Sequence, residues 1–399
     1  MAKRKRQLKA VQAAKLRKKR RSRRRKRALL LAFEIIILMM LMGTAYVMAK
    51  YEKFQTVTID TEDIEINEGA EKEGYTTVAL FGGDSRDGHL EKGTHADTII
   101  IASIDNQSKE IRMASIYRDT ILQQMDMEYN KANYAYFHGG PKEAINMLNK
   151  NLDLDIEDYV TVDFKALVDT IDLMGGLDIE IKEEEVDEVN EYMWETAEVA
   201  GTEQELLTRA GEQHLDGTQA VTYARIRSTA GGDYTRTERQ RLVIQKLFEK
   251  VIKTNLGTIN EIIDTVFPQV STSFTLNEII GLASGMTKYE LGDSAGFPFD
   301  KTDGISYQGA GSVVVPVGLA ENVEQLHEFL YPKEEQTGVS ETVEQISQDI
   351  SYITGVIRTP EYDEEPEETQ DEEEPEDDGS TPVITDVSQS QTGENETQE

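Results

Sequence analysis

The chain has 399 residues and a formal net charge of -33, with 42 Lys and Arg residues against 75 Asp and Glu residues. It contains no cysteine, which excludes a disulfide framework, a zinc–thiolate centre and a cysteine nucleophile. Residues 1–27 nevertheless carry 16 of the basic residues and no acidic one, so the remaining 26 basic and 75 acidic residues give the rest of the chain a charge of -49. These segments must be interpreted separately.

An apolar segment follows the basic one and predicts a membrane anchor. Residues 28–49 carry one charge, Glu34, and a helix of this length spans about 33 Å, enough for a hydrocarbon core of about 30 Å. Cytoplasmic flanks are rich in Lys and Arg, so we expect residues 1–27 inside and residues 50–399 outside the cell membrane. A cleavable signal peptide is the alternative, although its apolar core usually has about 7–15 residues.

The basic segment, residues 1–27, has two possible partners. Its 16 charges exceed what membrane topology requires, which favours contact with anionic lipid. Nucleic acid is not expected, because the segment has no aromatic residue on which bases could stack. An exported chain without cysteine is also typical of a Gram-positive-type envelope.

The segment after the anchor begins with a polar stalk and continues as a globular domain. Residues 50–74 are acidic and are interpreted as the stalk or linker. Compact apolar runs then predict strands at 76–81, 98–104 and 111–116, with a hairpin turn at 105–109. Further strands are predicted at 159–163, 177–181 and 312–317, and helices at 141–152, 164–174, 217–223, 233–253, 274–286 and 323–330.

This alternation, with one strand pair joined by a hairpin, predicts an α/β fold. We expect a mixed α/β/α sandwich, with a central mixed sheet flanked by helices, over residues 75–331. The acidic stretch 183–207 is interpreted as a surface excursion. Residues 332–399 are predicted to be a disordered acidic tail, since 361–399 contain 17 acidic residues and no basic one.

Charged residues gather at three places where the surrounding pattern is apolar. These places are residues 82–88, residues 95–98 together with 117–120, and residues 223–227 together with 231–240. Ends of strands in α/β sheets are where ligand sites form. Each place alone has an ordinary explanation, such as a turn or a surface ion pair, and only their combination indicates a site.

The third place contains four arginines within 15 positions of an otherwise acidic domain. They are Arg225, Arg227, Arg236 and Arg239. Arginine suits bidentate phosphate binding, and a polyanionic ligand would relieve the repulsion among these charges. Asp84 and Asp97 could then hold Mg²⁺, which takes a few carboxylates together with ligand phosphates.

In these stretches the chain resembles the LytR-CpsA-Psr family of cell-envelope proteins. The order and spacing of seven blocks agree, and the resemblance covers residues 75–253 and extends to about 331. The blocks are residues 80–86, 96–99, 115–120, 131–140, 168–177, 211–217 and 223–240. The topology of a short inner segment, one helix and a large outer domain also agrees.

The resemblance implies an enzyme that transfers a glycopolymer, such as teichoic acid or capsule, from a polyprenyl-pyrophosphate carrier to peptidoglycan. By the same resemblance, Asp84 and Asp97 hold Mg²⁺ or Mn²⁺, and one of them or Asp233 helps to deprotonate the acceptor hydroxyl. The expected catalytic set is Asp84, Asp97, Arg118 and Asp233. The expected pyrophosphate contacts are Arg86, Arg118, Arg225, Arg227, Arg236, Arg239 and Gln240. An apolar groove would take the prenyl chain.

Two departures from the family pattern are visible, and three alternatives to the transferase stay open. His95 and Ala96 stand where many members have Arg before Ser or Thr, which removes a phosphate contact or makes it depend on pH. Tyr117 stands where Pro is common. The alternatives are a non-catalytic scaffold that binds polyprenyl phosphate or wall polymer, an envelope-linked regulator, and a pyrophosphatase that uses water as acceptor.

Overall fold

The computed structural model describes residues 40–57, 59–83, 85, 90–229, 231–335 and 338–358. Residues 40–51 are helical, whereas the first part of the predicted anchor, residues 28–39, lies outside the described residues. No helix within the described ranges is both long and apolar enough to cross a membrane. The basic segment 1–27 and the end of the acidic tail also lie outside the described residues.

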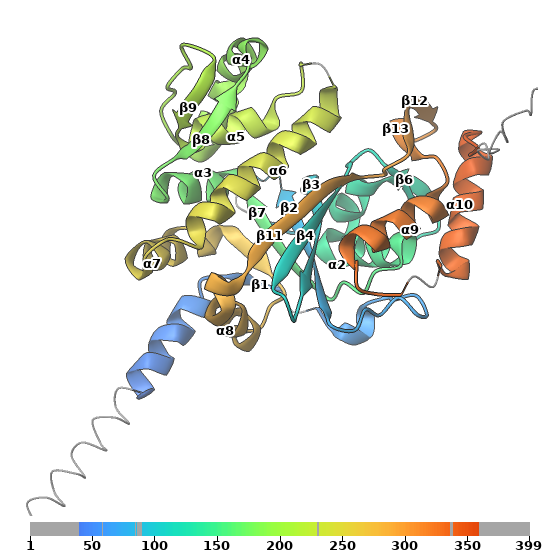
Figure 1. Ribbon diagram of the computed structural model, residues 1–399, viewed down its shortest axis with the longest axis horizontal. Coiled ribbons are helices and arrows are strands. Elements are labelled where there is room, and N and C mark those ends of the chain that lie inside the picture. Colours follow the sequence, from blue (N-terminus) through green and yellow to red (C-terminus); the bar gives the residue numbers. More distant parts are fainter. Residues whose placement is uncertain are drawn as a thin grey trace, which may run out of the picture. The chain divides into compact units, whose positions relative to one another are not determined.

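A central mixed sheet organises the described part of the chain (Figure 1). Its strand order is β1-β10-β7-β2-β3-β4-β11. The bounds are Gln55–Thr56 for β1, Val270–Thr272 for β10, Asp158–Asp163 for β7, Tyr75–Gly83 for β2, Ala96–Asp105 for β3, Glu110–Ile116 for β4 and Glu290–Phe297 for β11. Strands β2, β3 and β4 are antiparallel, while β7 runs parallel to β2 and β11 parallel to β4. The predicted β3–β4 hairpin is confirmed.

Helices cover both faces of this sheet (Figure 1). One face packs against α2 (Ala132–Leu152), α9 (Leu319–Leu330) and α10 (Glu341–Thr354), and the other against α3 (Phe164–Leu173) and α6 (Gly232–Val251). The side chains of β3 alternate between the two cores: Ile99 and Ile101 lie on the α2 side, and Ile100 lies on the α6 side. Because both faces are covered, the middle of this strand, residues 99–102, is apolar on both sides, and the predicted mixed α/β fold is confirmed.

A smaller layer packs on α3 and α6. It consists of β8 (Leu177–Ile181), α4 (Glu183–Ala200), β9 (Gly211–Leu215) and α5 (Gly217–Arg225), which share a buried core. The acidic stretch that we interpreted as a surface excursion is therefore mostly the helix α4. Its buried side chains Val189 and Met193 face the core, and its many glutamates cover the outside.

Two short strand pairs and two further helices complete the fold. The pairs are β5 (Ile121–Gln123) with β6 (Tyr129–Lys131), and β12 (Lys301–Tyr307) with β13 (Gly311–Pro316); the helices are α7 (Leu256–Thr265) and α8 (Leu276–Gly285). The hairpin β12–β13 is joined to the exit of β4, because the backbone N–H of Val314 donates to the carbonyl of Asp119 at 2.9 Å. Strand β12 was not predicted from the sequence.

The folded part continues beyond residue 331, which differs from the expected start of the disordered tail. Helix α10 begins after Ser340, whose side chain accepts a hydrogen bond from the backbone N–H of Val343. Its apolar side chains Val343, Ile346 and Ile350 are buried in the same core as α2 and α9. Apolar residues at helical spacing, rather than the acidic composition of the wider region, determine the structure here.

Candidate functional site

Four strand ends meet at one edge of the central sheet. Gly83, the last residue of β2, pairs with Ala96 on β3 and with Asp163 at the end of β7. Strand β4 ends at Ile116, which pairs with Ile99 of β3. Asp97 and Arg118 therefore lie close together at this edge, although 20 residues separate them in the sequence. The structure therefore brings together the two parts of the second charged place, residues 95–98 and 117–120.

Asp97 is the centre of an arginine cluster. Arg118 Nη1 donates a hydrogen bond to Asp97 Oδ1, Arg227 Nη2 lies 3.8 Å from Oδ2, and Arg236 Nη2 lies 3.5 Å from the backbone carbonyl of Asp97. Burial disfavours the charged carboxylate, but the positive charges of Arg118, Arg236 and Arg227 outweigh it and hold the pKa of Asp97 below its usual value. Asp97 is thus ionised at neutral pH.

Asp233 joins the same three arginines from the first turn of α6. Its Oδ1 lies 2.8 Å from Arg236 Nη2, 3.8 Å from Arg118 Nε and 3.9 Å from Arg227 Nε. Two carboxylates therefore share three guanidinium groups, which leaves this set with one excess positive charge. Such a set favours an anionic ligand.

Two of these arginines have buried N–H groups without a hydrogen-bond partner in the described part of the chain, and such groups indicate an anionic ligand. Arg118 Nε and Arg236 Nε and Nη1 are buried and have no hydrogen-bond partner among the described residues. The whole Arg236 residue is only 2% exposed, and burial lowers its pKa to about 10, so it is still charged at neutral pH. Buried donors without partners are costly, and the oxygen atoms of a phosphate group would satisfy them.

The cluster forms one wall of a cavity of about 250 Å³. The predicted site residues in its lining are Asp97, Arg225, Arg227, Arg236 and Gln240. Arg225 is held against this wall, with its guanidinium 4.3 Å from the ring centroid of Phe164 and its Nη1 donating to Thr196 Oγ1 at 2.8 Å. Tyr192 and Phe164 also line the cavity, and neither was singled out from the sequence.

An apolar cavity of about 270 Å³ adjoins the first one. It lies between the sheet and the helices α3 and α6, and its lining includes Leu80, Ile100, Val162, Leu167, Val243, Ile244 and Leu247. Phe164 and Gln240 line both cavities. A ligand with a charged end and an apolar chain therefore finds a matching surface for each part.

The structure does not bring Arg239 into this cluster, which differs from our expectation. Its Nη2 lies 2.9 Å from Glu185 Oε1, and Nη1 donates to the carbonyl of Ile226 at 3.1 Å. Three residues turn an α-helix by roughly 300°, so the side chains of Arg236 and Arg239 diverge by roughly 60°. That divergence turns Arg239 toward α4, where it makes a buried ion pair.

Asp84 and Arg86 lie outside the described residues. Within the described ranges there is no group of three or more His, Cys, Asp or Glu residues that could hold a metal ion. The carboxylate of Asp97 has the oxygen chemistry that Mg²⁺ requires, and Asp84 follows Gly83, the partner of Ala96, directly in the chain. The residues present are therefore compatible with a Mg²⁺ ion that is completed by phosphate oxygens.

Comparison with known proteins identifies the family. Residues 39–310 match the LytR_cpsA_psr family. The chain belongs to this family. The match includes the whole arginine cluster and both cavities, so the LytR-CpsA-Psr resemblance that the sequence blocks indicated is confirmed.

Two curated LytR-CpsA-Psr relatives have related names. The polyisoprenyl-teichoic acid–peptidoglycan teichoic acid transferase TagV of Bacillus subtilis is 28% identical over 209 residues, which cover 50% of this chain and 51% of TagV. The transferase TagU of Enterococcus faecalis, which has the same descriptive name, is 29% identical over 246 residues, which cover 59% of this chain and 75% of TagU. The chain thus spans about half of the length of the first of these relatives.

Solved structures show the same fold. A protein described as a transcriptional regulator from Enterococcus faecalis superposes with a TM-score of 0.55 at 23% identity, covering 74% of this chain and all of that one. TagT bound to LI-WTA superposes with a TM-score of 0.51 at 19% identity, covering 75% of this chain and all of TagT. At this level of identity the likeness concerns the fold alone.

Proposed function

We propose that the protein transfers an anionic glycopolymer, such as teichoic acid or capsule, from a polyprenyl-pyrophosphate carrier to peptidoglycan. This proposal rests on one observation: the arginine-rich cavity and the apolar cavity adjoin each other, because Phe164 and Gln240 line both of them. A lipid pyrophosphate combines a charged group with a long apolar chain. The names of the relatives TagV and TagU support the same reaction.

The arginines bind and neutralise the pyrophosphate. Arg118 and Arg236 offer buried N–H groups that have no partner among the described residues. Arg227, in the loop after α5, and Arg225, at the end of α5, line the cavity. Phosphoryl transfer depends mainly on positioning and charge neutralisation, which such donors supply. Gln240 would contact the lipid-side phosphate, since it lines both cavities.

The reaction exchanges the phosphoanhydride bond of the pyrophosphate for a new phosphoester bond. The oxygen of the acceptor hydroxyl attacks the phosphorus atom that carries the sugar, the bond from this phosphorus to the bridging oxygen breaks, and polyprenyl phosphate leaves with the bonding electrons. The hydroxyl proton passes to a carboxylate of the set Asp84, Asp97 and Asp233. Asp97 also fixes the guanidinium groups of Arg118 and Arg227.

A divalent cation belongs to this proposal. Asp97 together with Asp84 would hold Mg²⁺, or Mn²⁺ in its place. When bound, the ion neutralises phosphate charge that the arginines do not reach.

The membrane location is also part of the proposal. A single helix over residues 28–49 would keep residues 1–27 in the cytoplasm, next to anionic lipid, and hold the catalytic domain outside, close to its lipid-borne donor. Protease treatment of intact cells tests this topology. Digestion of residues 75–331 from outside is expected, whereas protection of this domain would contradict it.

The activity is tested with full-length protein in lipid nanodiscs. The protein receives a short saccharide linked to a polyprenyl pyrophosphate, a peptidoglycan acceptor and Mg²⁺. A phosphodiester-linked product is expected, and it should disappear with EDTA and in the Asp97→Ala and Arg118→Ala variants. Tight lipid binding without product would identify a binding scaffold, and release of free saccharide phosphate would identify a pyrophosphatase.

A further inference from the structure

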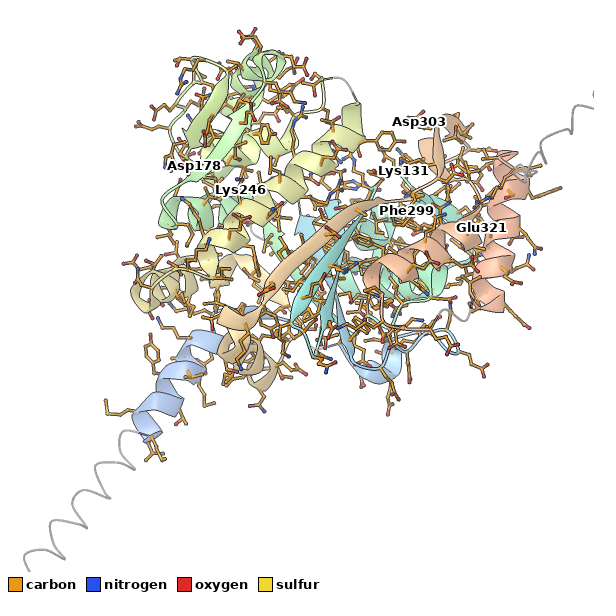
Figure 2. All side chains as sticks on the ribbon, viewed as in Figure 1. Lys131, Asp178, Lys246, Phe299, Asp303 and Glu321 are labelled. Atoms are coloured by element: carbon orange, nitrogen blue, oxygen red, sulfur yellow. The ribbon has the colours of Figure 1, made fainter. Side chains whose placement is uncertain are left out.

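Besides the two cavities, a groove of about 460 Å³ also includes Asp97 in its lining, on a different side from the arginine-rich cavity. Its walls are the exit of β4, the end of β6, the first turn of α2 and the turn between β12 and β13. Figure 2 shows Lys131 of this groove, on β6, apart from Asp178 on β8 and Lys246 on α6. Asp97 lines both this groove and the arginine-rich cavity.

Hydrogen bonds fix this groove to the segment after β4 that carries Arg118. The backbone N–H of Asn133 donates to the carbonyl of Arg118 at 3.1 Å, and that of Ala132 donates to the carbonyl of Thr120 at 2.8 Å. Lys131 Nζ lies 3.0 Å from Asp119 Oδ1. The first turn of α2 therefore keeps a constant position relative to the arginine cluster.

The side chains of the groove suit a glycan. The side-chain amide of Asn133 makes no hydrogen bond within the described residues, and it offers both donors and an acceptor, which matches sugar hydroxyl groups. The ring of Tyr134 also lines the groove, stacked on that of His138 at 5.6 Å between centroids, and its apolar face can pack against a sugar ring. The main cations and anions of the groove are already paired, Arg118 with Asp97 and Lys131 with Asp119.

The position of the groove fits the geometry of the proposed reaction. The apolar cavity lies on the face of the sheet that α3 and α6 cover, whereas α2, which forms the groove, covers the other face. In phosphoryl transfer the attacking and leaving oxygens lie roughly in line on opposite sides of phosphorus. If the lipid phosphate leaves toward the apolar cavity, the acceptor hydroxyl must arrive from the side of the groove.

We propose that this groove binds the peptidoglycan acceptor, with Asn133 and Tyr134 contacting its sugar rings and the reacting hydroxyl directed toward Asp97. This inference rests on the proposed transferase function. Both residues belong to the α2 side of the site and neither touches the arginine-rich cavity.

The test separates acceptor binding from donor binding. Full-length Asn133→Ala and Tyr134→Ala variants in nanodiscs are compared with Asn277→Ala and Tyr352→Ala, which remove the same side chains from exposed positions on α8 and α10. Thermal unfolding confirms that each variant is folded. The KM for a peptidoglycan tetrasaccharide and the KM for the lipid-linked donor are then measured separately, and tetrasaccharide binding is measured by calorimetry without donor.

We expect each groove variant to raise the acceptor KM by about 5- to 10-fold, the effect of about one lost hydrogen bond or ring contact, while the donor KM and the control variants stay unchanged. A rise in donor KM with an unchanged acceptor KM would instead assign the groove to the sugar of the donor and overturn the proposal. If wild-type protein makes no product, the transferase function fails. Calorimetry still tests acceptor binding in the groove in that case. If both groove variants bind the tetrasaccharide more weakly than wild type, the proposed acceptor site is supported. If wild-type protein does not bind the tetrasaccharide, the proposed acceptor site is overturned.

Discussion

The ring of Tyr117 packs edge-on against the ring of Tyr234, with 4.7 Å between their centroids and 74° between their planes. Tyr117 directly precedes Arg118, and Tyr234 directly follows Asp233, so this contact joins the exit of β4 to the first turn of α6 at the arginine cluster. Lys301 Nζ lies 5.1 Å and 5.0 Å from the two ring centroids. The tyrosine at a position where the family commonly has Pro therefore positions two charged residues of the site.

Removing the Tyr117 ring is expected to affect both stability and turnover. Tyr117→Ala should lower the free energy of unfolding by about 3–5 kcal/mol, as for other buried aromatic residues. It should also lower kcat about 100-fold, because small displacements of catalytic groups have effects of this size. Tyr117→Phe keeps the ring and should stay within about twofold of wild type. Urea unfolding and the transfer assay measure the two effects, and an Ala variant with the wild-type kcat would show that the contact does not position Arg118.

Substitution of Arg236 on α6 should mainly lower transfer activity, whereas substitution of Arg239 on the same helix should mainly lower stability. Arg236→Ala removes unpartnered donors from the proposed pyrophosphate site and should lower transfer by about 10²–10³, with little loss of stability. Arg239→Ala leaves the carboxylate of Glu185 buried without its partner and should lower the free energy of unfolding by about 3–5 kcal/mol. Transfer kinetics and denaturant unfolding of both variants check this contrast, and a folded, inactive Arg239→Ala protein would return Arg239 to the site.

Much of the fold could be predicted because apolar runs and turns are local signals. The apolar run at 99–102 in β3 and the hairpin turn that begins at Asp105 both follow from a few adjacent residues. Strand β12 could not be predicted, since it lacks a clear apolar pattern and pairs with β13 through a register shift between Thr302 and Ile305. Helix α10 was missed because acidic composition outweighed its three apolar residues in our interpretation.

The candidate site could be predicted in composition but not in arrangement. Clustered arginines in an acidic domain indicated an anion site, and the structure gathers Arg227 and Arg236 around Asp97 and places Arg225 in the wall of the same cavity. The direction of a side chain on a helix depends on which neighbours the helix packs against, so spacing alone did not separate Arg239 from Arg236. The pairing of Asp97 with Arg118 depends on strand register, which residue types alone do not determine.

The apolar cavity should determine affinity for the lipid part of the donor. Ile244 of α6 lines this cavity, and Ile244→Trp would fill part of its roughly 270 Å³. We expect the KM for a long-chain donor to rise about tenfold, whereas a donor with a short prenyl chain should be affected much less. Ile280→Trp is the matched control, because Ile280 is exposed on α8. Equal effects on long and short donors would show that the chain binds elsewhere.

The turn between β3 and β4 should make stability depend on pH. Lys333 donates a hydrogen bond to the carboxylate of Asp105, and the backbone N–H groups of Gln107 and Ser108 donate to its Oδ1 at 2.8 and 2.9 Å. These interactions, with Lys333 the largest, hold the pKa of Asp105 well below its usual range. A folded-state pKa below the unfolded value stabilises the protein above about pH 4, and this contribution is lost as pH falls through the folded pKa.

Asp105→Asn should therefore cost stability at neutral pH and much less in acid. At pH 7 we expect the free energy of unfolding to fall by about 1.5–3 kcal/mol, the value of hydrogen bonds to a charged group, although screening of the exposed Lys333 reduces its share. Between pH 4 and pH 2 the difference from wild type should shrink, because Asp105 takes up a proton in the unfolded chain before it does so in the folded protein, and this favours unfolding of the wild type. Urea unfolding at several pH values measures the difference, with Asp293→Asn on an exposed position of β11 as control. A difference that stays constant down to pH 2 would mean that the charge of Asp105 does not stabilise the turn.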